Sequence, residues 1–277
     1  MNAGHLSNQI KTKRSFLCVG LDTEFEKIPE SVRFVNQPQF EFNREIIRAT
    51  YKQVIAYKIN TAFYEARGAS GWEEMEQTVA FIRSIDPGIM VIADAKRGDI
   101  GNTSEMYARA FFDRMGVDAV TVSPYMGYDT VSAFLKREDK WVIILAVTSN
   151  NSAEDFQFLN VGDNVHTLYE KILLTSRQWG TIDNIMYVAG ATRSEQILRI
   201  RKHIPDHFLL VPGIGAQGGD LEEVARYGIN AQCGLIINTS RAVIFADDSK
   251  NFATTANLKA AELQQQMETI LRANKLI

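Results

Sequence analysis

The sequence is poor in cysteine, has no long apolar run and carries almost no excess charge. Its 277 residues include two cysteines, Cys18 and Cys233. Both lie in apolar runs, so we expect buried, reduced thiols in a cytoplasmic protein rather than a disulfide. No apolar stretch reaches the roughly 18 residues of a membrane span. The net charge of −3 predicts no broad basic surface, which argues against nucleic acid or an anionic membrane as a partner.

Histidines are also few and scattered. The four are His5, His166, His203 and His207. None stands at metal-ligand spacing from another histidine or from a cysteine, so we expect no metal site. The first 16 residues are polar, with several basic side chains and no apolar segment, so we expect no signal peptide. The remaining composition, 45% hydrophobic and 23% charged, is typical of a soluble globular chain.

A recurring unit dominates the chain: an apolar, β-forming run followed by a stretch long enough for a helix. Eight such runs occur, at Phe16–Leu21, Ile55–Asn60, Ile89–Asp94, Ala119–Ser123, Trp141–Val147, Asn184–Val188, Phe208–Val211 and Gly234–Asn238. They are continuously apolar, as strands buried on both faces should be. Eight strand–helix units predict a (β/α)8 barrel, with a doubly wound open sheet as the alternative. No linker divides the chain, so we expect residues 1–277 to form one domain.

The barrel fold places its ligand contacts at the carboxyl ends of the strands. Polar residues stand at several predicted strand ends, namely Asp22, Asn60, Ser123, Thr148 and Ser149. The connections after the first strand (residues 22–38) and the fifth (residues 148–163) are long, so we expect them to contact a ligand or to close over it. Ser123 lacks a G-x-S-x-G elbow, which argues against a serine hydrolase.

The third predicted strand ends in V-I-A-D-A-K-R-G-D-I, residues 91–100. Asp94 and Lys96 are two residues apart, so an extended backbone points both to one side. Asp99 lies in the turn beyond, and Lys58 is a spatial neighbour if the strands pair in order. Alternating ammonium and carboxylate groups keep each other ionised and present a protonated lysine that could donate to a carbanion. A structural ion-pair network at the rim is the alternative.

The seventh and eighth predicted strands run into turns suited to phosphate. Gly213, Gly215 and Gly218 formally match G-x-G-x-x-G, but the position and the lack of a following acidic residue argue against a dinucleotide site. We favour backbone amides that face a phosphate, with Gln217 as a further donor. Arg241, after the eighth strand, suits bidentate phosphate contact at the usual barrel phosphate site. Glycines that serve only as turn residues are the alternative.

Several segments together resemble one family, the orotidine 5′-phosphate decarboxylases. D-A-K-R-G-D-I (residues 94–100) is similar to the D-x-K-x-x-D-I signature of that family. Five further segments fit in order: F-L-C-V-G-L-D (16–22), Y-K-I-N-T-A-F-Y-E (57–65), T-V-S-P-Y-M-G (121–127), the glycine turn with Gln217, and I-N-T-S-R-A (237–242). The pattern is most similar to the longer bacterial subgroup, in which R-G-D-I-G-N-T follows the lysine. D-x-K-x-x-D alone is less specific, because related barrel lyases that act on sugar phosphates share it.

The resemblance implies a (β/α)8 barrel, a homodimer with a shared active site, and conversion of orotidine 5′-phosphate to UMP and carbon dioxide without metal or organic cofactor. It implies that Lys96 donates a proton within an array of Lys58, Asp94, Lys96 and Asp99, with Asp99 reaching across the dimer interface. The implied substrate contacts are Asp22, Asn60, Ile100, Thr103, Thr148, Ser149 and Pro212, and the implied phosphate contacts are Gly213, Gly215, Gln217 and Arg241. Residues 149–166 are longer than in the short-form enzymes of the family.

Two other functions fit parts of this pattern. A related sugar-phosphate lyase or aldolase would use the same barrel but would need a divalent metal, so loss of activity on chelation would distinguish it. A non-catalytic barrel that binds a phosphate ligand would need no proton donor, and the complete set of two lysines and two aspartates argues against it.

Overall fold

Eight parallel strands close into a barrel in the order β1-β10-β9-β8-β5-β4-β3-β2. The computed structural model describes residues 1–162, 165–190, 194–213 and 220–277. The barrel strands are β1 (Leu17–Gly20), β2 (Ala56–Asn60), β3 (Met90–Arg97), β4 (Ala119–Val122), β5 (Trp141–Val147), β8 (Ile185–Ala189), β9 (Leu209–Pro212) and β10 (Leu235–Thr239). Each overlaps one predicted run, so the barrel is confirmed and the open-sheet alternative is wrong.

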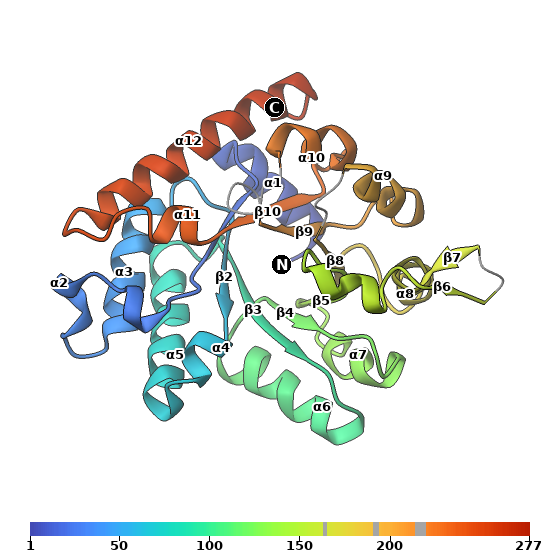
Figure 1. Cartoon of the computed structure of the whole chain (residues 1–277), viewed down its shortest axis with the longest axis horizontal. Helices are drawn as coiled ribbons and strands as arrows, with labels where there is room; N and C mark the ends of the chain where they lie inside the picture. Colours follow the sequence, from blue (N-terminus) through green and yellow to red (C-terminus); the bar gives the residue numbers. More distant parts are fainter. Residues whose placement is uncertain (163–164, 191–193, 214–219) are drawn as a thin grey trace.

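Helices surround the strands and connect each one to the next (Figure 1). They are α1 (Ala3–Lys13), η1 (Phe25–Lys27), α2 (Glu30–Arg33), α3 (Pro38–Thr50), α4 (Ala62–Glu65), α5 (Gly68–Ile85), α6 (Gly101–Ala108), the π-helical η2 (Arg109–Arg114), α7 (Tyr128–Leu135), η3 (Asn151–Asp155), α8 (Leu168–Ser176), α9 (Ser194–His203), α10 (Leu221–Gly228), α11 (Arg241–Ile244) and α12 (Phe252–Ala273). Within the described ranges, no helix combines the length and apolar character that crossing a bilayer requires.

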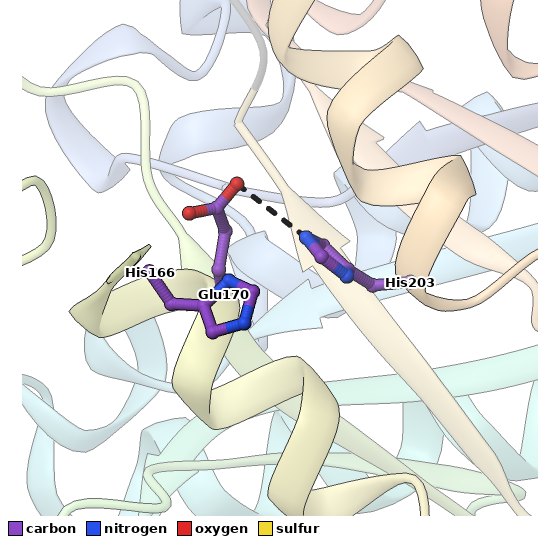
Figure 2. Close-up of side chains that lie close together, drawn as sticks. All are labelled: His166, Glu170 and His203. Carbon is purple, nitrogen blue, oxygen red and sulfur yellow. Dashed lines mark hydrogen bonds and ion pairs between the residues drawn. The ribbon is translucent and has the colours of Figure 1, made fainter. Parts of the chain in front are cut away.

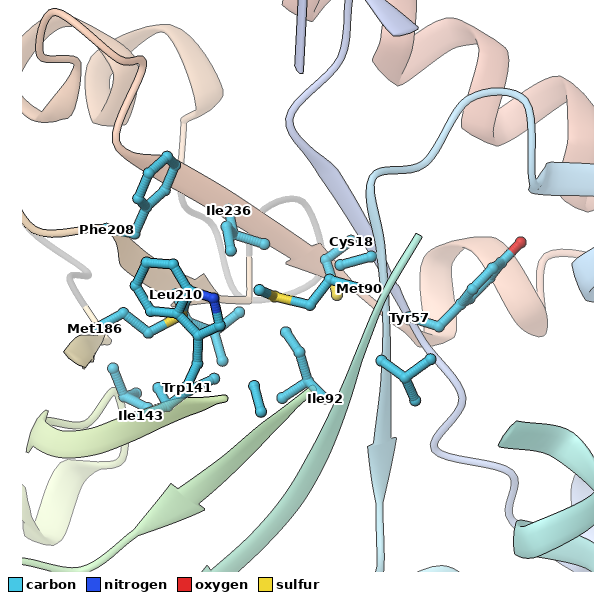
Figure 3. Close-up of a cluster of buried hydrophobic side chains, with 14 of the residues drawn as sticks. Cys18, Tyr57, Met90, Ile92, Trp141, Ile143, Met186, Phe208, Leu210 and Ile236 are labelled. Carbon is cyan, nitrogen blue, oxygen red and sulfur yellow. The ribbon is translucent and has the colours of Figure 1, made fainter. Parts of the chain in front are cut away.

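The strands read as continuous apolar runs because both of their faces are covered. Figure 3 shows inward side chains of several strands gathered between them, among them Cys18, Ile92 and Ile236. Tyr57 points the other way, and its hydroxyl lies 2.7 Å from the Thr50 hydroxyl on α3. The outward residues thus pack on the helices, while the inward residues fill the barrel as a solid core.

The inward positions become polar where the strands end. Register pairs Lys58 with Ile92 and Asn60 with Asp94 across β2 and β3. Successive side chains of a strand alternate between its faces, so Asp94 faces the same way as Ile92, two residues before it. The strand pairing that the sequence analysis assumed therefore holds, and it brings the charged residues of two strands to one edge of the barrel.

Helix α1 covers the opposite end of the barrel. The indole of Trp141, at the start of β5, donates to the Met1 carbonyl at 3.0 Å, and the Ala3 amide donates to Asp183 at 2.9 Å. Leu6 and Ile10 of α1 are buried. Since this end is closed by packed side chains, the carboxyl ends of the strands are the face open to ligands.

The long connection after β5 contains structure that the sequence did not predict. It holds η3 and a small antiparallel hairpin of β6 (Asn160–Val161) and β7 (His166–Thr167), which projects from the rim of the molecule (Figure 1). Helix α8 then begins with a capping box between Thr167 and Glu170, which satisfies amide donors of its first turn.

Candidate active site

Four charged side chains at the ends of β1, β2 and β3 form an alternating chain of carboxylates and ammonium groups. The Lys58 ammonium lies 2.9 Å from an Asp22 oxygen and 3.1 Å from an Asp94 oxygen. The second Asp94 oxygen lies 2.6 Å from the Lys96 ammonium. The order is therefore Asp22–Lys58–Asp94–Lys96, which we call the charged array. The structure thus brings together three of the four residues predicted for the array and adds Asp22, which the resemblance placed among the substrate contacts.

Exposure changes along the charged array. The Lys58 side chain is 5% exposed and that of Asp94 is 12% exposed, whereas that of Lys96 is 49% exposed. Burial alone would lower the pKa of Lys58, but the carboxylates of Asp22 and Asp94 outweigh it and raise that pKa above its usual range. Burial would raise the pKa of Asp94, but Lys58 and Lys96 outweigh it and lower that pKa to about 2. The inner part of the array is therefore fully ionised at neutral pH, and Lys96 is the member that an incoming ligand can reach.

The backbone at Lys96 departs from a regular strand. Lys96 has a φ of 47°, in the left-handed region, and the register between β3 and β4 shifts between Ala93 and Arg97. Such a conformation costs about 1–3 kcal/mol for a residue with a side chain. The Lys96 amide donates to the Thr121 hydroxyl at 2.9 Å, which compensates for a bond lost from the ladder. The two-residue spacing predicted that Asp94 and Lys96 meet, which is confirmed, but they do so through a bulge rather than a straight strand.

Two hydroxyl groups that sequence reasoning missed hold the carboxylates of the array. Thr121 donates to Asp94 at 2.9 Å, and Ser240 donates to Asp22 at 2.8 Å. A Cβ atom at Gly20 would lie 1.9 Å from the Ser240 hydroxyl oxygen, so this contact requires glycine there. Both hydroxyls lie in segments that resemble the family, but a hydroxyl at a strand end is too common to be singled out from one sequence.

Asp99, Ile100 and Thr103 lie in the turn after β3 and at the start of α6. The Asp99 carboxylate accepts from the Ile100 amide at 2.7 Å, and its carbonyl accepts from the Ser104 hydroxyl at 2.6 Å. These contacts are local, and Ile100 is 54% exposed. The role of this segment across a dimer interface stays a prediction.

The residues predicted for the pyrimidine and the ribose lie on two sides of the mouth. Asn60 ends β2, and its side-chain oxygen accepts from the amide of Ala62, the first residue of α4, at 3.3 Å. Thr148 follows β5, where the Gln157 side chain accepts from its amide and donates to its hydroxyl, both at 2.8 Å. Thr148 and Ser149 line a polar cavity, and Thr148 also borders a second, mainly apolar one. Both residues predicted to contact the pyrimidine therefore line a cavity next to the end of β5.

The predicted phosphate residues follow β9 and β10, which are neighbours in the barrel. Pro212 pairs with Asn238 across these strands, and Gly213 next to it has a φ of 87°, which favours glycine. Arg241 is exposed at the start of α11. Gly215 and Gln217 lie outside the described residues. The structure therefore places Pro212, Gly213 and Arg241 at adjacent strand ends.

This site combines two chemical capacities. An exposed ammonium group fixed by a buried, ionised carboxylate can stabilise a developing anion and donate a proton to it. An exposed guanidinium group at a neighbouring strand end can bind an oxyanion such as phosphate.

The sequence and the fold of this chain are similar to those of known proteins. The sequence model described as the orotidine 5′-phosphate decarboxylase / HUMPS family matches residues 15–256. An orotidine 5′-phosphate decarboxylase of Phocaeicola vulgatus is 55% identical over 271 residues, 98% of this chain and 99% of its own. The structure of Leishmania donovani OMP decarboxylase has a TM-score of 0.83 at 34% identity and covers 98% of this chain and 99% of its own. That of Leishmania donovani UMP synthase has a TM-score of 0.84 at 35% identity and covers 96% of this chain and 55% of its own.

Proposed function

The chain belongs to the orotidine 5′-phosphate decarboxylase / HUMPS family, and from that premise we propose that it is a carboxy-lyase. It converts orotidine 5′-phosphate to UMP and carbon dioxide, the last step of pyrimidine nucleotide synthesis, with residues 1–277 acting as one decarboxylase domain. The observation that carries the proposal is the charged array, whose one exposed ammonium group, Lys96, stands 2.6 Å from the ionised Asp94. The proposed chemistry requires no metal or organic cofactor.

Lys96 is the proposed proton donor. The bond between a pyrimidine ring carbon and the substrate carboxylate breaks, the electron pair stays on that carbon, and neutral carbon dioxide leaves. The Lys96 ammonium stabilises the developing negative charge and transfers a proton to the same carbon. The resulting neutral amine then regains a proton from solvent. Because Asp94 and the Thr121 bonds fix this region before substrate arrives, little reorganisation accompanies the reaction.

Asp94 has a second proposed role. Its carboxylate stays ionised because its pKa is lowered to about 2 by the two lysines against the effect of burial. A substrate carboxylate bound beside it is repelled, and this repulsion is relieved as neutral carbon dioxide forms. Lys58 holds Asp94 from the side away from Lys96, so it acts on the reaction by positioning Asp94.

The phosphate group is proposed to bind between Gly213 and Arg241, together with Gly215 and Gln217. The support is the adjacency of the β9 and β10 ends and the exposure of the Arg241 side chain. Asp22 and Asn60 are proposed to contact the ribose, and Thr148 or Ser149 to contact the pyrimidine, beside Pro212. Binding energy gained at the phosphate can support closure around the substrate, which excludes water from the array.

A homodimer with a shared active site is proposed as the working form in the cytoplasm. Asp99, Ile100 and Thr103 are the proposed contributions to the partner's site. Ile100 and, on α6, Met106 are 54% and 51% exposed. Because large apolar side chains are commonly buried at interfaces, this exposure supports a dimer interface at this segment.

Loss of orotidine 5′-phosphate absorbance, measured with and without a chelator, tests the function. The proposal expects decarboxylation that persists in the chelator. Activity only with added divalent metal on a sugar phosphate would favour the related lyase or aldolase. Ligand binding with no turnover would favour a non-catalytic phosphate-binding barrel.

A further inference from the structure

Three side chains of metal-binding type meet away from the charged array. They are His166 on β7, Glu170 in the first turn of α8 and His203 at the end of α9 (Figure 2). Their candidate ligand atoms all lie within 4.8 Å of one another. Spacing along the sequence does not reveal this cluster, because His203 reaches it from a different helix.

The geometry of the cluster is close to that of a coordination site. A Glu170 oxygen lies 3.4 Å from His203 Nε2, and the two imidazole rings stand at 84° with centroids 5.6 Å apart. Bonds of about 2.0–2.2 Å to a tetrahedral zinc ion separate ligand atoms by about 3.3–3.5 Å. A contraction of at most about 1.5 Å at the widest pair would therefore complete a set of two imidazoles and one carboxylate.

Glu170 is oriented for this role by its own neighbours. Its second oxygen accepts from the Thr167 amide at 2.9 Å and from the Thr167 hydroxyl at 3.0 Å. These bonds hold the carboxylate so that the other oxygen faces the histidine ring. Hydrogen bonds of this kind to a ligating carboxylate fix its orientation and strengthen metal binding. The side chains of Glu170 and His203 are 10% and 18% exposed, so the site is sheltered but accessible.

We propose that His166, Glu170 and His203 bind one divalent first-row transition metal ion, of which Zn²⁺ is the natural probe, with water at the remaining position. Two nitrogen ligands and one oxygen ligand favour such ions over Mg²⁺ or Ca²⁺, which prefer all-oxygen sites. The ion joins the β6–β7 hairpin to helices α8 and α9. This is a structural site, separate from the proposed decarboxylation, and no catalytic step uses it.

Hydrogen bonds connect the proposed metal site to the end of β5 at the barrel rim. The Tyr169 amide, in the first turn of α8, donates to the Gln157 carbonyl at 3.0 Å. The Gln157 side chain holds Thr148 at the end of β5. The metal therefore anchors the far end of a connection whose near end borders the proposed active site.

Titration of the metal-free full chain with Zn²⁺ tests the proposal. We expect saturable binding of one ion per chain, followed calorimetrically, and a rise in Tm on binding. Co²⁺ should give the visible absorption of a nitrogen- and oxygen-ligated ion, and excess Mg²⁺ should not compete. Absence of saturable Zn²⁺ binding would overturn the proposal and leave the Glu170–His203 contact as an ordinary hydrogen bond.

Variants separate this site from adventitious binding elsewhere. His203→Ala and His166→Ala should each weaken Zn²⁺ binding at least about tenfold, since even the loss of outer partners of metal ligands costs about 10–100-fold. Glu170→Gln keeps the residue type that a capping box accepts, so it should retain the fold of α8 and still lose affinity. His5→Ala, at an exposed histidine of α1, is the matched control and should bind Zn²⁺ as the unaltered chain does. Equal affinity in His203→Ala and His5→Ala would overturn the assignment.

Discussion

The two sides of the barrel mouth are built differently. At β1, β2 and β3 the functional groups sit on or next to the strands and bond to one another, with Lys58 at the buried centre between two carboxylates. At β5, β9 and β10 all of them except Pro212, the last residue of β9, sit on the connections. Thr148 is held by Gln157 from the loop beyond it, and Arg241 is exposed at the start of a four-residue helix.

This difference matches two different physical demands. A group that stabilises a short-lived carbanion must already be in place, because reorganisation during the reaction would add to the barrier. Groups that bind a phosphate or a base can move with their loops and close when the ligand arrives. We therefore expect substitutions on the strand side to lower turnover and substitutions on the loop side to weaken binding.

Replacement of the proton donor should give the largest effect. Lys96→Ala removes both the donor and the stabilising charge, so we expect kcat to fall by more than about 10⁴-fold, the upper end of what proton donation alone contributes. UMP should still bind through its phosphate. Decarboxylation kinetics and UMP calorimetry measure the two effects.

Lys250→Ala is the control for Lys96→Ala, because Lys250 is an exposed lysine outside the site. It should leave kcat unchanged. Near-normal turnover in Lys96→Ala would show that Lys96 is not the proton donor. The proposed difference in function between the two sides would then be wrong.

On the loop side, Arg241→Ala should act mainly on binding. Charge-assisted hydrogen bonds contribute about 1.5–3 kcal/mol each, so we expect KM to rise by about 10–100-fold with a smaller change in kcat. Steady-state kinetics over a wide substrate range separates the two constants. A large fall in kcat with unchanged KM would contradict the division between the sides, because it would make Arg241 part of the chemistry.

Acid should weaken the strand side through Asp94. Its pKa is lowered from 3.8 to about 2 in the folded protein, so the ionised form stabilises the fold above pH 4, and that contribution is lost as the pH falls towards 2. The shift corresponds to about 2 kcal/mol of unfolding free energy. Urea unfolding at pH 7 and pH 2 measures this contribution. Between these pH values, the unfolding free energy of the wild type should fall by about 2 kcal/mol more than that of Asp94→Asn.

Asp248→Asn, at an exposed aspartate, serves as the control for acid unfolding. Its free energy of unfolding should fall between pH 7 and pH 2 by the same amount as that of the wild type. If Asp94→Asn also loses as much stability as the wild type on acidification, the lysines do not hold Asp94 ionised in the way that the charged array requires.

The sequence predicted the strand side better than the loop side, for physical reasons. Strands buried on both faces appear in the sequence as apolar runs, and parallel pairing of these strands in order predicts that Lys58 lies near Asp94, as it does. The left-handed backbone at Lys96 was not predictable, because it depends on a bond to Thr121 on another strand. The β6–β7 hairpin and the meeting of His166 with His203 depend on tertiary packing that no local pattern encodes.

The smallest expected effect is also the sharpest test of rigidity on the strand side. Thr121 does not belong to the charged array, but its hydroxyl accepts from the Lys96 amide and donates to Asp94. Thr121→Val keeps the shape and removes both bonds, so we expect kcat to fall about tenfold with little change in KM, and Thr121→Ser to restore it. Thr130→Val is the matched control, because the Thr130 hydroxyl is buried with no hydrogen-bond partner among the described residues. This substitution should leave kcat unchanged. If Thr121→Val also kept full kcat, the bulge would position Lys96 without Thr121, and preorganisation would have to come from the lysine–carboxylate pairs alone.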